Sequence, residues 1–158
     1  MKKTNASKDA GIREEGQKLA LVRIRGPTGV RVDIADTLSH LRLTRRNHCV
    51  IVPKNVAYTG MVLKVKDYIT WGDIDEETYK MLTEKRMEDY KGLASDRKNK
   101  ISYDAKFMEI DGKKMKKVFR LNSPRKGYGR KGIKTPFIKG GALGYRGAKI
   151  NDLIQRMI

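Results

Sequence analysis

LALVRIRG, residues 19–26, places Ala20, Val22 and Ile24 on one side of an extended chain and two arginines on the other. This alternation with a period of two is typical of a half-buried strand. Further along, HCVIVP (48–53) is apolar on both sides and stops at a proline, which indicates a fully buried strand. The two segments predict neighbouring strands of one sheet.

A helix is predicted between these two strands. Asp33 is a residue type that caps helices, and Ile34, Leu38 and Leu41 recur at the i, i+4, i+7 spacing of one helical face. We expect this helix to end near Leu43.

A second helix and a third strand follow. Asn55–Thr59 is predicted as a loop and GMVLKVK (60–66) as a short helix, while DYITWGDI (67–74) has the β-branched and aromatic residues of a strand. The order β-α-β-α-β predicts an α+β core over residues 19–74. We expect a three-stranded sheet with both helices on one face.

The rest of the chain is less regular. DEETYKMLTEKRMEDY (75–90) is acidic at its start and basic near its end, as the helix dipole favours. In the polar stretch 91–112 we expect one helical turn around Tyr103–Met108. VFRLN (118–122) is predicted as a short strand or an extended arm, and KINDLIQRMI (149–158) as a terminal helix.

Composition divides the chain into four parts. The opening residues are rich in Gly, Ser, Lys and Glu and read as disordered. We expect a disordered leader (1–18), the α+β core (19–74), a helical extension (75–111), and a basic glycine-rich arm with the terminal helix (112–158).

The charge is large and unevenly spread. The 158 residues carry 36 basic and 18 acidic side chains, a net charge of +18. Between Asp67 and Asp111 acidic residues outnumber basic ones by twelve to eight, whereas Gly112–Asn151 holds thirteen basic residues and no carboxylate. Such a surplus favours a polyanionic partner, nucleic acid first and an anionic membrane surface second.

The segment RKGYGRKGIKTPFIKGGALGYRGAK (125–149) is suited to single-stranded or irregular RNA. Glycines permit close approach of the backbone, and cations meet phosphates. Tyr128, Phe137 and Tyr145 are spaced to stack on unpaired bases. We expect this arm to fold against RNA and to lack order without it.

Metal and cofactor chemistry has little support. His40, His48 and Cys49 are the only imidazoles and thiol, and a zinc site needs about four ligands. Ile133 stands where a phosphate loop would have its lysine, and Pro136 blocks the following helix. We predict no metal, no cofactor and no catalysis, with Cys49 as a core residue.

Membrane insertion and secretion have no signal either. No apolar run approaches the roughly 18 residues that a membrane span needs. The opening residues lack the apolar region of a secretory signal. A single cysteine excludes an internal disulfide, so we expect a cytoplasmic protein.

Specific motifs then resemble a known family. Apolar and basic positions between Thr37 and Ile69 match its pattern, as do the longer stretches LVRIRG (21–26), NHCVIVP (47–53), VKDYITWG (65–72), VFRLNSPRKGYGRKGIK (118–134) and GGALGYRG (140–147). The chain resembles the large-subunit ribosomal protein "L thirty" family, whose eukaryotic relative is called "L seven". The short leader and the long C-terminal part favour the archaeal form.

The resemblance implies a structural constituent of the large (50S) ribosomal subunit in the cytoplasm, without catalysis. It implies 23S-type rRNA as partner, with the 5S rRNA region and neighbouring ribosomal proteins nearby. It also implies that loops at one end of the sheet bind RNA, here Arg25–Arg31, Arg45–His48 and Tyr58–Gly60. The residues predicted to bind RNA are Arg23, Arg25, Arg31, Arg45, Arg46, Asn47, His48, Tyr58 and Gly60 in the core, and Arg125, Lys126, Tyr128, Arg130, Lys131, Lys134, Lys139, Tyr145 and Arg146 in the arm.

Three other functions rank lower. A non-ribosomal RNA-binding or RNA-modifying accessory protein is the main alternative, and an enzyme of that kind would need a cofactor pocket or a carboxylate pair. A chromatin-like protein would hold duplex DNA as tightly as folded RNA, although no recognition-helix motif is visible. A membrane-binding protein would associate with acidic vesicles.

Overall fold

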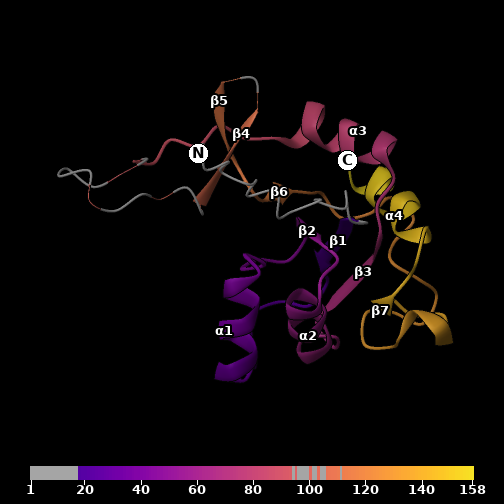
Figure 1. Cartoon of the computed structure of the whole chain (residues 1–158). Helices are drawn as coiled ribbons and strands as arrows, with labels where there is room; N and C mark the ends of the chain where they lie inside the picture. The colour runs from indigo at the N-terminus through magenta and orange to yellow at the C-terminus, as the bar shows by residue number, and fades with distance from the viewer. Residues whose placement is uncertain (1–17, 94, 96–99, 101–102, 104–105, 111) are drawn as a thin grey trace, which may run out of the picture.

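A mixed five-stranded sheet organises the molecule (Figure 1). The computed structural model describes residues 18–93, 95, 100, 103, 106–110 and 112–158, so the predicted leader lies outside the described residues except for Lys18. The sheet order is β6-β2-β1-β3-β7. Its strands are β1 (Lys18–Arg23), β2 (His48–Pro53), β3 (Ile69–Asp73), β6 (Phe119–Arg120) and β7 (Gly144–Tyr145).

The first face of the sheet confirms the predicted β-α-β-α-β core. Helices α1 (Val32–His40) and α2 (Val56–Lys64) cover it, and β1 pairs antiparallel with both β2 and β3. Apolar residues from all five elements and their loops form this core: Leu19, Leu21, Leu38, Leu41, Leu43, Val50, Val52, Val62, Val65 and Ile69. The three central strands and two helices therefore occur in the predicted order.

Helix boundaries differ from the prediction at two capping positions. The Asn55 side chain accepts a hydrogen bond from the Tyr58 N–H at 3.0 Å, so α2 begins at Val56 within the predicted loop. At the other helix, Asp33 lies in the first turn and Arg31 occupies the N-cap without a side-chain hydrogen bond. A negatively charged side chain interacts favourably with the positive N-terminal end of the helix dipole both at the N-cap and in the first turn, so Asp33 still favours the start of α1.

A second pair of helices, whose placement was not predicted, covers the opposite face of the sheet, whereas α1 and α2 lie together on the first face as predicted. Helices α3 (Glu76–Arg86) and α4 (Lys149–Met157) lie on the side to which Ala20, Val22 and Ile24 point. Successive strand residues point to opposite faces, and both faces of β1 are apolar and buried. A sheet of this kind needs a layer on each side.

The basic glycine-rich segment is not a separate arm, and the expected three-stranded sheet is wrong for the same reason. Strand β6 pairs with β2, and β7 pairs in parallel with β3. Phe119, Ala142 and Leu143 are buried together with the apolar side of α4. The segment therefore folds against the protein's own sheet, since it brings enough apolar surface to complete the second core.

A two-stranded hairpin begins in the last part of the polar stretch. It consists of β4 (Phe107–Ile110) and β5 (Lys113–Lys116), and in Figure 1 it stands beyond the sheet, away from α1 and α2. Residues 104 and 105 of the predicted helical turn lie outside the described residues, and its end at Phe107 is strand. The Tyr90 N–H donates to the Lys114 carbonyl at 2.8 Å, which ties the hairpin to the chain after α3. None of the described helices is long and apolar enough to cross a membrane.

Candidate nucleic-acid interface

Three loops meet at one end of the sheet. Because β1 runs antiparallel to β2 and β3, its end at Arg23 lies beside the starts of the other two strands. The connections 24–31, 41–47 and 65–68 therefore lie together, and we refer to them as the loop end. Two of the three predicted RNA-binding loops, Arg25–Arg31 and Arg45–His48, belong to it.

Exposed arginines mark the loop end. Arg45 and Arg46 are exposed, and Arg31 is exposed with an ion pair of 3.3 Å to Asp33. Arg25 is half-buried, with its guanidinium 4.8 Å from the Tyr68 ring centroid. The loop end thus presents cations and an aromatic ring to solvent, a combination that suits phosphates and bases.

Arg23 holds the loop end together from inside. Its side chain is buried, and its guanidinium donates to the carbonyls of Leu43 at 2.6 Å and Thr44 at 3.0 Å. It also donates to the carbonyls of Arg25 and Gly26. Burial lowers the pKa of Arg23. Its donors are therefore used within the protein, where they fix the shape of two loops.

Tyr58 and Gly60 lie elsewhere. Both are in the first half of α2, which starts just after Pro53, and Pro53 pairs with Lys18 at the opposite end of the sheet. Tyr58 is half-buried against the first core, whereas Gly60 is exposed. Tyr58 lines a small hollow together with Leu41 and Arg42, whereas Gly60 does not, and a role for either residue in RNA binding stays a prediction.

A direct bond joins the loop end to the basic segment. The Tyr128 hydroxyl donates to Oδ1 of Asn47, and Asn47 Nδ2 donates to the Ser123 hydroxyl at 3.3 Å. Among the described residues, the non-glycine residues with positive φ are Arg42, Asn47 and Lys126. All three lie in the loops that meet here. The loop end and the segment 123–130 thus form one continuous basic surface.

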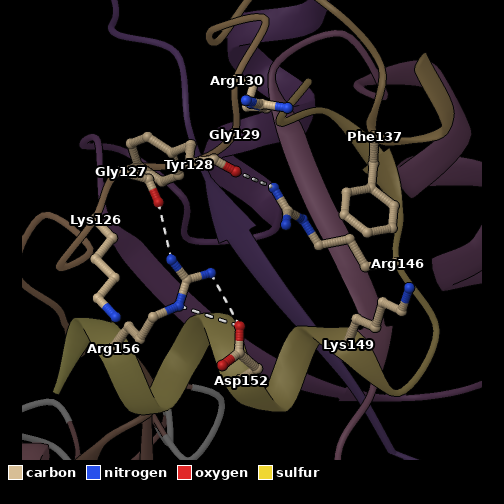
Figure 2. Close-up of a pocket in the computed structure, with 10 residues that line it drawn as sticks. All are labelled: Lys126, Gly127, Tyr128, Gly129, Arg130, Phe137, Arg146, Lys149, Asp152 and Arg156. Atoms are coloured by element: carbon tan, nitrogen blue, oxygen red, sulfur yellow. Dashed lines mark hydrogen bonds and ion pairs between the residues drawn. The ribbon is translucent and has the colours of Figure 1, made fainter. Parts of the chain in front are cut away.

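A hollow of about 560 Å³ opens beside this junction (Figure 2). The chain around Gly127–Arg130 forms one wall, Phe137 and Arg146 lie opposite, and α4 closes the base. Arg156 of α4 donates to the carbonyls of Arg125 and Gly127 at 3.1 and 3.0 Å. The residues that line the hollow are Lys126, Gly127, Tyr128, Gly129, Arg130, Phe137, Arg146, Lys149, Asp152 and Arg156.

Arg146 anchors the segment and is itself only 7% exposed. Its Nε donates to the Thr70 hydroxyl at 2.9 Å, and a terminal nitrogen donates to the carbonyls of Ala142 and Tyr128. The guanidinium also lies 4.5 Å from the centroid of the Phe137 ring. Burial, with the nearby charge of Arg156 as the next cause, lowers the pKa of Arg146 to about 10.

Tyr145 and the outer cations are more accessible. Tyr145 is 50% exposed, and its hydroxyl donates to Asp73 at 2.5 Å, which raises the pKa of the phenol. The short 3-10 helix η2 (Phe137–Lys139) shapes the outer part of the segment. The predicted cations on this part are all exposed: Arg125, Lys126, Arg130, Lys131, Lys134 and Lys139.

Cys49, the one thiol in the sequence, is not suited to nucleophilic chemistry. Cys49 is fully buried in the second core, as predicted, and burial raises the pKa of its thiol to about 12. A thiol in this state is a packing residue and a poor nucleophile.

Comparisons with known proteins decide the family. A family model described as "Ribosomal protein L30p/L7e" matches residues 19–69. The chain is 47% identical to the large ribosomal subunit protein uL30 of Methanococcus vannielii, over 88% of this chain and 98% of the relative. For the proteins of the same name in Methanopyrus kandleri and Nanoarchaeum equitans the identities are 42% and 48%, covering 85% and 88% of this chain and 100% and 97% of the relatives. The chain belongs to the ribosomal protein L30p/L7e family.

Membership of the L30p/L7e family confirms the resemblance seen in the motifs. The family model spans β1 to the start of β3 and so includes all three connections of the loop end. The archaeal relatives match a much larger share of the chain, and the similarity therefore extends well beyond β3.

Two basic residues of this L30p/L7e protein were missed by the sequence analysis. Lys149 and Arg156 line the hollow from α4, yet neither was among the residues predicted to bind RNA, although Lys149 ends the basic segment 125–149. A signal was present, because Lys149, Asp152 and Arg156 recur at helical spacing on the face opposite the buried residues. The polar face of the predicted terminal helix, considered together with its apolar face, would have identified both cations.

Proposed function

We propose that this protein is a structural constituent of the large ribosomal subunit and has no catalytic role. The observation that carries this conclusion is the identity of 41–48% to archaeal uL30 proteins over nearly their whole length. Its partners are then large-subunit rRNA of the 23S type and neighbouring ribosomal proteins. The resemblance of the motifs further supports a position near the 5S rRNA.

We infer that rRNA binds along the surface formed by the loop end and the segment 123–139. Arg45 and Arg46 are exposed on one part of it, and Arg130, Lys131 and Lys134 on the other. A protein that neutralises six to ten phosphates loses roughly 10³–10⁵ in affinity between 50 and 200 mM salt. We expect this protein to show a salt dependence of that size.

Arg23 and Arg146 act indirectly in this proposal. Both are buried and donate to acceptors within the protein. They hold the loops in the conformation that binds RNA, whereas the exposed cations contact the phosphates directly.

Sedimentation tests the assignment to the ribosome. Cell lysate is separated on a sucrose gradient at low and moderate salt, and this chain is detected by antibody. We expect it to sediment with the large subunit at both salt concentrations. Sedimentation as a free protein, or with bulk DNA, would contradict the proposal and favour a non-ribosomal RNA-binding protein.

A charge-matched pair of variants tests the surface. Arg45→Ala/Arg46→Ala removes two cations from the loop end, and Lys80→Ala/Lys85→Ala removes two exposed lysines from α3. We expect the first variant to bind large-subunit rRNA more weakly, with a shallower salt dependence. Equal losses in both variants would show that net charge alone determines binding.

A further inference from the structure

The hollow beside α4 carries positive charge that the protein does not balance. Five cations line it, and Asp152 is the only carboxylate among the lining residues. Arg156 binds this carboxylate through two nitrogens, at 3.0 and 3.1 Å. Figure 2 shows that this pair lies at the base of the hollow, so four cations remain without a carboxylate.

These cations fall into two groups. Arg146 and Arg156 are fixed by backbone carbonyls and form a rigid floor. The side chains of Lys126 and Arg130 form no hydrogen bond or ion pair with any residue of the described chain, and the Lys149 ammonium lies 5.9 Å from the centroid of the Phe137 ring. Three cations that are not held by the protein therefore line the hollow beside two fixed ones, an arrangement that suits a multidentate anion.

Like charges destabilise one another here. Arg146 is buried, and the charge of Arg156 adds to the effect of burial on its lowered pKa. An anion in the hollow would favour the charged guanidinium and relieve this repulsion.

The backbone at Lys126 is a separate observation. Its φ is 65°, a left-handed conformation in which a long side chain is uncommon and glycine is favoured. The next residue, Gly127, also has a positive φ of 73°. Strained residues of this kind cluster where a side chain contacts a ligand. At the rim of the hollow, a lysine takes the place that a glycine would occupy with less strain.

Resting on the proposed function, we propose that this hollow binds one backbone phosphate of large-subunit rRNA. Lys126, Arg130 and Lys149 contact its oxygens, while Arg146 and Arg156 supply the positive potential beneath it. An acidic protein segment would meet the same cations, but the cations of the hollow continue into the exposed basic surface 125–139, which suits a longer polyanion.

The test uses a variant designed to keep the fold. Lys126→Gly/Arg130→Ala removes two of the three cations that are not held by the protein, and glycine at position 126 relieves the strained φ. The matched control is Lys80→Ala/Lys85→Ala, which lowers the net charge equally on the outside of α3. Thermal unfolding of both variants verifies the fold, and we expect Lys126→Gly to leave the melting temperature unchanged or higher.

Two measurements on full-length protein and its large-subunit rRNA follow. First, the salt dependence of the dissociation constant is measured. Each lost phosphate contact lowers the slope of log K against log salt by about 0.7–0.9. We expect the hollow variant to lose roughly tenfold in affinity and about one unit of slope, and the control to lose neither.

Second, phosphate ethylation interference identifies the phosphates that matter. With wild-type protein, ethylation at a set of positions blocks binding. We expect that, for the hollow variant alone, ethylation at one or two adjacent positions of this set no longer affects binding.

An unchanged set with an unchanged slope overturns the hollow as a phosphate site, while wild-type binding leaves the proposed function intact. Failure of wild-type protein to bind rRNA overturns both. Loss of affinity for another ribosomal protein, with rRNA binding unchanged, would assign the hollow to an acidic protein segment and overturn the proposal.

Discussion

Arg146 and Thr70 are 76 residues apart in the chain, yet the guanidinium Nε donates to the threonine hydroxyl at 2.9 Å in the protein interior. The same guanidinium reaches the carbonyls of Ala142 and Tyr128. One buried side chain thereby connects β3 to both halves of the basic segment. This cation orders the segment from within the protein.

Replacing Arg146 by methionine should destabilise the fold. The change leaves the acceptors at Thr70, Ala142 and Tyr128 without their donor, and a buried polar group left unsatisfied costs about 1–3 kcal/mol. The three acceptors lose the same donor and can rearrange together, so their costs do not simply add. We expect the free energy of unfolding to fall by about 2–4 kcal/mol in total. Denaturant titration followed by the fluorescence of Trp71, which lies next to Tyr145, measures it. Arg130→Met is the control, because Arg130 is exposed, and an equal loss there would contradict the anchoring role of Arg146.

Amide exchange in the free protein should reveal an ordered basic segment. The Arg146 N–H donates to the Trp71 carbonyl at 2.8 Å, and those of Leu121 and Ala142 donate to Asn47 and Thr135. Because these carbonyl acceptors belong to the protein, we expect protection at the three amides without RNA. Exchange at the unprotected rate throughout 119–146 would restore the interpretation of the segment as an arm that RNA orders.

The parts of the fold that the sequence predicts are those with a local signal. The strand at 18–23 and the helices at 32–40 and 149–157 each repeat an apolar pattern within one element. The strand at 48–53 is one continuous apolar run, and the helix at 76–86 carries charges at its ends that suit the helix dipole. Strands β6 and β7 have two residues each, too few to show a period. They exist because Cys49 and Trp71 offer a free sheet edge, and that pairing is visible only once the chain is folded.

The residues that bind RNA can likewise be predicted only in part from the sequence. Arg23 and Arg45 are both basic residues near strand ends, and nothing local distinguishes them. Arg23 is buried because the carbonyls of Leu43 and Thr44 fold back onto it, whereas Arg45 remains exposed. The sequence predicts which residues are available for RNA, but tertiary contacts decide which are used inside the protein.

Two glycines should respond in opposite ways to alanine. A Cβ on Gly72 in β3 would lie 2.1 Å from the Gly147 carbonyl oxygen and 2.9 Å from the Ile150 Cβ. We expect Gly72→Ala to lower the free energy of unfolding by about 3 kcal/mol, since overpacking at backbone atoms is poorly relieved. Gly60, in the interior of α2, meets nothing within 4 Å, so Gly60→Ala should raise it by about 0.5–1 kcal/mol. Thermal and denaturant unfolding compare the two, and a destabilised Gly60→Ala would contradict the open environment described for that residue.

The same Gly60→Ala variant tests the predicted RNA contact in α2. If RNA approaches the backbone there, the added methyl group should weaken rRNA binding although the fold is stabilised. Since α2 starts at the opposite end of the sheet from the loop end, we expect the affinity to be unchanged. A clear loss of affinity in a correctly folded variant would instead add this helix to the interface.

His48 should make stability depend on pH below about 6.5, the ordinary pKa of a histidine in the unfolded chain. Its ring is buried at the start of β2, and burial is the first cause that lowers its pKa, with the charges of Arg120, Arg45 and Arg23 acting in the same direction. Above the unfolded value of about 6.5 the ring is neutral in both states, so it adds no pH dependence. As the pH falls below that value, the unfolded chain binds a proton that the folded protein resists, and the free energy of unfolding declines until the folded pKa is passed.

Denaturant titrations at several pH values measure this decline. We expect His48→Gln to flatten it, because glutamine has no proton to gain, whereas His40→Gln should keep it, since His40 is exposed on α1. A His48→Gln variant that declines as steeply as the wild type would mean that other groups cause the dependence. Bound rRNA should weaken the effect in the wild type, because phosphates beside Arg45 offset the positive charge that opposes protonation of His48.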